Sequence, residues 1–162
     1  MLITQKKQYA LRAIFELAKR HGRGPIKIST IARVQAIPMR FLEVILNELK
    51  KSGFVSAKRG YQGGYYLLRR PRDIAVGDVI RFMDKTGEGE QDCIACVSKD
   101  NCPFDGQCAL SPMWEKVWES LFCVYDGTTM QDLLELELER IKNRKQQDHT
   151  AQGGCDRRGL GI

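Results

Sequence analysis

Apolar residues recur every three or four positions in several stretches of the chain, a pattern typical of helices with one buried face. The first stretch covers residues 5–21 and ends at glycines and Pro25, which stop a helix. A short helix is predicted from the N-cap residue Ser29 to Gln35, and after a turn a second helix runs from Pro38 to Lys51. On this second helix we expect an inward face made of Phe41, Leu42, Ile45, Leu46 and Leu49.

A hairpin signature follows these helices. Residues 54–58 and 65–68 are rich in strand-forming residues, and the glycine-rich segment 59–64 between them predicts a tight tip. A further short helix is expected over residues 76–84. Helix, short helix, turn, helix and two-stranded hairpin is the order of a winged helix-turn-helix. The predicted fold class is therefore mainly α with a small β-wing.

The remainder of the chain divides by composition. Residues 86–110 are polar, lack periodicity and carry cysteines, so we expect a loop. Apolar positions return at helical spacing over 112–125, and after Asp126-Gly127 a second helix is capped by Thr128 or Thr129. The predicted organisation is a winged helix-turn-helix (1–85), a cysteine-rich loop (86–110), two helices (111–145) and a disordered polar tail (146–162).

Charge is distributed unevenly along the chain. Residues 1–72 hold 16 Lys and Arg against three acidic residues, whereas residues 73–162 hold 10 against 17. A net charge of +13 on the winged half suits a polyanion such as double-stranded DNA, although a solvated basic face or a protein-interaction module remains open. In a winged helix-turn-helix the second helix enters the major groove, and an arginine at the wing tip suits the narrow minor groove. The candidate DNA-binding residues are Lys27, Ser29, Pro38, Met39, Arg40, Phe41, Glu43, Lys58, Arg59 and Gly60, although core packing is favoured for Phe41.

Four of the six cysteines lie within sixteen residues, spaced Cys93-x2-Cys96-x5-Cys102-x5-Cys108. Thiolates are soft ligands that suit iron–sulfur clusters and zinc. Structural zinc sites usually pair two tight knuckles, and only one tight pair is present here, so the spacing favours a cluster. Zinc, a thiol–disulfide switch and inert thiols stay open at this point. Cys123 lies among apolar residues, which predicts a packing role, and Cys155 falls in the tail.

Several of these segments together resemble one family, the winged-helix iron–sulfur cluster regulators of the IscR/NsrR type. The resemblance covers about residues 1–140 and implies a homodimer on a palindromic operator, with the long helix after the cysteines crossing its partner. It also implies a [2Fe–2S] or [4Fe–4S] cluster on Cys96, Cys102 and Cys108, with Glu43 and Arg59 as base readers. The residues that carry it are Thr4, Lys6, Tyr9-Ala10, 28–36, Phe41-Leu42-Glu43, Val55, Arg59-Gly60, Gly63-Gly64-Tyr65, 74–80, the three cysteines and Trp114.

The chain departs from this family at one ligand position. IscR-like members complete the cluster with a histidine three residues after the last cysteine, where this chain has Ser111, and NsrR-like members can use an N-terminal carboxylate, where it has Gln8. Cys93 is the substitute fourth ligand that we expect, and a spare thiol is the alternative role for it. The resemblance also implies a transcriptional repressor that senses iron–sulfur status, redox state or nitric oxide.

Other classes of function are disfavoured. No nucleophile arrangement or phosphate-binding glycine loop is present in the sequence, which argues against an enzyme. An electron-transfer or scaffold protein would not need a basic winged half. No apolar run is long enough to span a bilayer, and the first residues lack a secretory signal, so we expect a cytoplasmic protein without a membrane partner.

Overall fold

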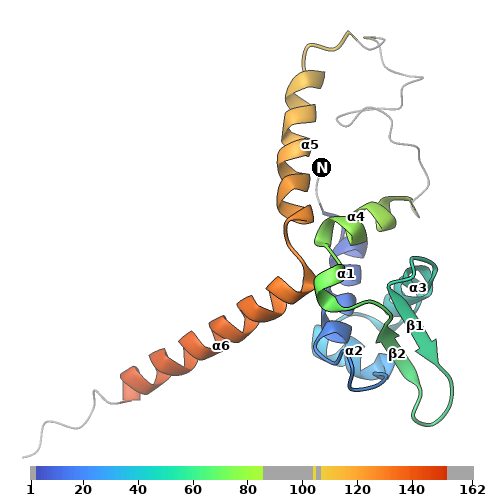
Figure 1. Ribbon diagram of the computed structural model, residues 1–162, viewed down its shortest axis with the longest axis vertical. Coiled ribbons are helices and arrows are strands. Elements are labelled where there is room, and N and C mark those ends of the chain that lie inside the picture. The colour runs from blue at the N-terminus through green and yellow to red at the C-terminus, as the bar shows by residue number, and fades with distance from the viewer. Residues whose placement is uncertain (1–2, 86–103, 105–106, 153–162) are drawn as a thin grey trace, which may run out of the picture.

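The computed structural model describes residues 3–85, 104 and 107–152. Helices α1 (Gln5–Ala18), α2 (Ile28–Gln35) and α3 (Met39–Lys51) precede strands β1 (Val55–Lys58) and β2 (Gly64–Leu67), a short 3-10 turn η1 (Pro71–Asp73) and α4 (Val76–Lys85). Two further helices, α5 (Ser111–Asp126) and α6 (Met130–Gln152), project away from this body in different directions (Figure 1). The mainly α fold with a small β-wing is confirmed.

The core lies between α1, α2, α3, α4 and the hairpin. Ala10, Ala13 and Ile14 of α1 are fully buried, as are Leu42 and Leu46 of α3. Burial of these apolar faces supplies most of the driving force for folding, because each buried aliphatic side chain contributes about 1.5–3 kcal/mol. The α5 and α6 helices join this core through Phe122 and Met130.

The hairpin is a two-stranded antiparallel sheet with Val55 opposite Leu67 and Lys58 opposite Gly64. We call residues 55–67 the wing. The segment between α1 and α2 pairs with β2, because Ile26 and Tyr65 exchange two backbone hydrogen bonds of 2.8 Å. This pairing places Lys27, at the start of α2, beside the wing.

A second long-range pairing joins the segment before α4 to the segment before α6. Val76 N–H donates to Thr128 O, and Met130 N–H donates to Ile74 O, both at 2.9 Å. Thr129 caps α6, since its hydroxyl accepts from Asp132 N–H at 3.2 Å and its own N–H donates to the Asp132 carboxylate at 2.8 Å. The base of α6 is thereby attached to the winged body.

Several local predictions were wrong. The first helix ends at Ala18, and Ser29 is the second residue of α2, whose N-cap is Lys27. Phe41 points away from the core and is 63% exposed. The last helix continues to Gln152, past the predicted end near residue 145. The part of the tail after Gln152 lies outside the described residues.

Candidate functional site

The predicted DNA-binding residues lie on three neighbouring elements of the winged body. Pro38, Met39 and Arg40 open α3, with Phe41 and Glu43 in its first turns, and all five are exposed. The backbone reason for this placement is the turn before α3, where Ala36 adopts a left-handed conformation with φ of 47° and buried Ile37 fixes the chain to the core. The α3 helix therefore has a fully buried face and an outward face that carries these five residues.

The wing brings further predicted residues close to α2. Lys58, Arg59 and Gly60 are exposed at the end of β1 and in the tip. The Lys27 ammonium group lies 5.2 Å from the ring centroid of Tyr61, so a cation–π contact links the start of α2 to the wing tip. Lys27 and Ser29 are themselves exposed. The structure thus gathers residues from separate parts of the sequence on the exposed surface of one basic body.

Tyr61 is a residue that the sequence reasoning missed. Its side chain is 92% exposed although it is aromatic. The glycines around Tyr61 predicted a tight tip, but no repeating pattern of apolar residues in this segment indicated a role for the aromatic side chain. Its placement near Lys27 depends on the Ile26–Tyr65 pairing, which joins residues far apart in the chain.

The predicted cluster ligands are described only in part. Cys93, Cys96 and Cys102 lie outside the described residues. Cys108 is half-buried and free of a disulfide, and its carbonyl oxygen accepts a 3.0 Å hydrogen bond from Ser111 N–H at the start of α5. The part of the chain that the structure describes contains no group of three or more residues placed to hold a metal ion.

The structure also describes Ser111 and Gln8, which occupy the positions where IscR-like and NsrR-like regulators have their non-cysteine ligands. The Ser111 hydroxyl donates to the Glu115 carboxylate at 3.2 Å, and Gln8 is exposed on α1. Cys123 is exposed on α5, so the packing role predicted for it is not found within the single chain. The helical pattern placed it between Phe122 and Val124, but only Phe122 of these three is buried.

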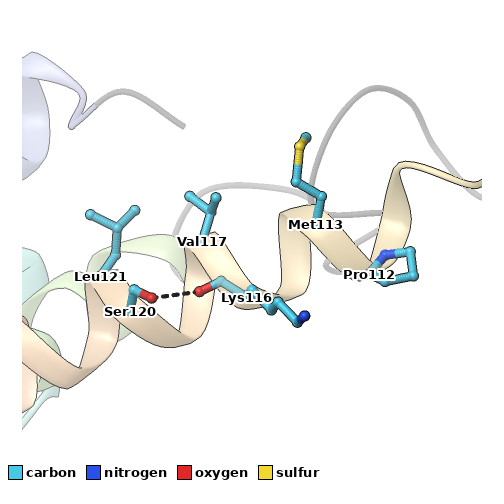
Figure 2. A pocket seen from close by; sticks show the side chains of 6 residues that line it. All are labelled: Pro112, Met113, Lys116, Val117, Ser120 and Leu121. Carbon is cyan, nitrogen blue, oxygen red and sulfur yellow. Dashed lines mark hydrogen bonds between the residues drawn. The ribbon is translucent and has the colours of Figure 1, made fainter.

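The α5 helix carries an apolar stripe along one side. Met113, Val117 and Leu121 project to the same side of the helix, where they line a shallow open hollow together with Pro112 and Lys116 (Figure 2). Met113 and Val117 are 47% and 44% exposed. Exposed apolar side chains gathered in this way are typical of a surface that contacts another chain.

The C-terminal part of α5 is attached to the winged body, and Leu121 at the end of the stripe lies near this attachment. Arg81 of α4 donates to both carboxylate oxygens of Asp126, at 2.8 and 3.0 Å, and lies 5.0 Å from the centroid of the Phe122 ring. Hydrogen bonding to Asp126, followed by that to Asp78, raises the pKa of Arg81 above its usual value. Trp118 stacks on Phe122 at a centroid separation of 4.6 Å. The C-terminal end of α5 is thus fixed against α4.

Comparison with known proteins identifies the family. Residues 3–136 match the Rrf2 family, which is described as iron-dependent transcriptional regulators. The chain belongs to the Rrf2 family. An Rrf2-like HTH-type transcriptional regulator of Rhodobacter capsulatus is 35% identical over 142 residues, which cover 82% of this chain and 92% of that protein.

Solved structures of two other regulators of this type share the fold. IscR of T. potens has a TM-score of 0.67 at 33% identity, covering 83% of this chain and 87% of its own. CymR of B. subtilis, titled the global cysteine regulator, has a TM-score of 0.62 at 29% identity, covering 84% and 98%. The family relatives are transcriptional regulators and not enzymes, in agreement with the prediction for this chain. Among the described residues no helix has the length and hydrophobicity to cross a bilayer.

Proposed function

We propose that this Rrf2-family transcriptional regulator is a homodimer that binds a palindromic operator in double-stranded DNA and senses through an iron–sulfur cluster. The observation that carries the DNA-binding part is the exposure of the candidate residues on α2, the first turns of α3 and the wing, within a half of the chain whose net charge is +13. A helix of this size fits the major groove, and the wing suits the adjacent minor groove.

Each candidate group has a chemical role in this arrangement. Arg40 can donate to guanine or to a phosphate, and Glu43 can accept from the amino group of cytosine. Arg59 at the wing tip is attracted by the negative potential of a narrow minor groove. Lys27 and Lys58 are phosphate contacts, which position the protein without reading sequence.

The dimer is supported by the apolar stripe on α5. Met113, Val117 and Leu121 follow one another at intervals of four residues, so pairing with the same stripe of a second chain buries all three at once. We propose that a two-fold axis through this contact presents the two α3 helices to half-sites about one helical turn apart, the spacing that dimeric helix-turn-helix proteins require.

The donor set in the cysteine segment fits an iron–sulfur cluster. We propose Cys93, Cys96, Cys102 and Cys108 as ligands, with Cys93 in the fourth position, because a serine hydroxyl at position 111 is a poor ligand and Ser111 is engaged with Glu115. Four thiolates are compatible with either a [2Fe–2S] or a [4Fe–4S] cluster. When bound, the cluster supplies one-electron redox chemistry and sensitivity to oxidants.

A connection from this segment to the DNA-binding surface follows from the position of Cys108. Cys108 lies three residues before Ser111, which begins α5. At the C-terminal end of the same helix, the ion pair between Arg81 and Asp126 fixes α5 to α4. A change in the cysteine segment therefore acts on the same helix that holds the winged body in place. We propose that cluster occupancy shifts the population of dimers whose α3 spacing matches the operator.

The test of the sensing part is an anaerobic absorption spectrum with iron, sulfide and zinc analysis of freshly purified protein. We expect visible absorption with stoichiometric iron and sulfide, and loss of that absorption in Cys102→Ala. Cys123→Ala is the matched control, because Cys123 is an exposed cysteine outside the segment, and it should keep the full spectrum. A colourless protein that cannot be reconstituted would overturn the cluster and leave the DNA-binding part standing.

A second candidate is a regulator whose cysteines act as a thiol switch or hold zinc. The structural likeness to the regulator titled the global cysteine regulator favours it, since that likeness covers 84% of this chain. One zinc per chain, or a DNA affinity that changes on reversible thiol oxidation without iron, would support this candidate over the cluster.

A further inference from the structure

The outward face of α3 carries apolar side chains that the fold does not use. Val44 is 55% exposed and Phe41 is 63% exposed, although both are large hydrophobic residues. Because an α-helix has 3.6 residues per turn, Val44 lies on the side of α3 that faces away from buried Leu46 and Leu49. Phe41 lies three residues earlier, one turn along the helix on a neighbouring side.

The surroundings of Val44 are polar and basic. Arg40 precedes it by one turn and Asn47 follows it by nearly one turn, and both are exposed. Lys51, also exposed, lies seven residues after Val44 on the same side. On the flank beside Phe41, Glu48 forms an ion pair of 2.9 Å with Lys6 of α1, which ties that flank to the body. The apolar pair therefore sits inside a basic surface rather than at the edge of an apolar one.

A basic surface that contains an isolated apolar pair has a specific complement in DNA. The phosphates match the cationic groups, and the apolar group that the major groove offers in ordinary DNA is the C5-methyl of thymine. A single exposed apolar residue is common on protein surfaces. Two of them one turn apart, on the helix that carries Arg40 and Glu43, point to a contact with the groove.

We propose that Val44, with Phe41 beside it, reads thymine methyl groups in the major groove of the operator. This inference rests on the proposed DNA-binding function and adds a class of base contact to it. Arg40 and Glu43 recognise bases by hydrogen bonds, whereas Val44 and Phe41 discriminate thymine from cytosine and uracil by burying its methyl group. Loss of one such buried methyl weakens binding about fourfold.

The experiment begins with selection of duplexes from a random library by the full-length protein, purified anaerobically. In the enriched sequence, each thymine is replaced in turn by deoxyuridine, which removes only the methyl group, and the dissociation constant is measured. At one or two thymines in each half-site, we expect this replacement to raise the dissociation constant about fourfold. In Val44→Ala the penalty should fall at the thymine that Val44 contacts, because most of the apolar surface against that methyl is then removed.

Two further variants and an unfolding measurement test whether the deoxyuridine penalty depends on the apolar contact of Val44, and not on side-chain shape or on protein stability. Val44→Thr keeps the β-branched shape but replaces one methyl by a hydroxyl, and we expect a deoxyuridine penalty between those of the parent protein and Val44→Ala, because one methyl remains. Leu68→Ala removes an equally exposed side chain, 54% exposed after β2, and should retain the full deoxyuridine penalty. Thermal unfolding of Val44→Ala should match that of the parent protein, since Val44 contributes no buried surface to the core.

The outcomes distinguish this inference from the function on which it rests. Failure to enrich any duplex would overturn the DNA-binding function and this contact with it. An enriched duplex with no deoxyuridine-sensitive thymine would overturn the contact alone. The same conclusion follows if Val44→Ala and Phe41→Ala both retain the full penalty.

Discussion

Gly64→Ala is expected to separate the wing from the segment before α2. Gly64 opens β2 with φ of 154°, where its backbone passes directly over Ile26. A Cβ atom at this position would overlap the carbonyl oxygen of Ile26 and lie 3.0 Å from Lys27 N. Because the obstructing atoms belong to the backbone, they cannot rotate away, and the two segments must move apart.

The magnitude follows from what the movement breaks. Ile26 and Tyr65 exchange two hydrogen bonds of 2.8 Å, each worth about 1 kcal/mol. The unfavourable φ of an alanine at position 64 adds about 1–3 kcal/mol of strain. The expected loss in the free energy of unfolding is therefore about 3–5 kcal/mol. For a chain of this length that corresponds to a fall in Tm of roughly 6–20 °C.

The assay is thermal unfolding followed by far-ultraviolet circular dichroism, with Gly24→Ala as the matched control. Gly24 lies in the same segment with φ of 97°, but a Cβ there meets no atom within 4 Å. The control therefore carries the backbone strain without the broken hydrogen bonds and should unfold about 4–8 °C above Gly64→Ala. If both variants unfold at the same temperature, the wing does not depend on the Ile26–Tyr65 pairing and the reasoning is refuted.

Three other substitutions test separate parts of the structure. Arg59→Ala should weaken operator binding and relax preference in the minor-groove part of the site, as measured by competition between duplexes; unchanged affinity would remove the wing from the interface. Hydrogen bonds from the Thr129 N–H and hydroxyl lower the pKa of Asp132, so its stabilising effect is present above the unfolded pKa near 3.8 and is lost as pH falls through the lower folded value. Asp132→Asn should therefore be less stable than the parent protein at neutral pH and approach it in acid, and a constant difference in Tm across a pH series would contradict this. Arg81→Met should lower the free energy of unfolding, measured by urea titration, by no more than about 1 kcal/mol, because the side chains of Arg81 and Asp126 are both more than 40% exposed. A much larger loss would show that this ion pair contributes more to stability than its exposure implies.

The sequence pattern was informative where one periodicity decided the structure. The buried face of α3 at Leu42, Ile45, Leu46 and Leu49 follows directly from helical spacing. Phe41 fits the same spacing but is exposed, because an apolar residue at the edge of a helical face belongs to the core only if a neighbouring element covers it. No local pattern reports that neighbour.

Long-range pairings explain the remaining differences. The bridges Ile26–Tyr65 and Ala75–Thr129 join segments that are distant in the chain, and neither has a local signature. The α2 helix begins two residues earlier than its Ser29 cap signal suggested, since its N-cap is Lys27 and Ile28 is already helical next to the strand-like pairing at Ile26. The predicted ligands Cys93, Cys96 and Cys102 remain a sequence prediction, since they lie outside the described residues.

The pairing of Ala75 with Thr129 affects where insertions and deletions can be tolerated during the evolution of this fold. The backbone leaves the winged body after α4 and re-enters it at Thr128, next to the segment that precedes α4. The chain between Lys85 and Thr128 thus begins and ends at the winged body, and α5 within it is held there by Phe122 and by the pair of Arg81 with Asp126. Doubling the length of a flexible loop costs only about 0.6 kcal/mol. Insertions and deletions between these attachment points can therefore accumulate among relatives, and the sensing chemistry can diversify, while the surface proposed to meet DNA keeps its shape.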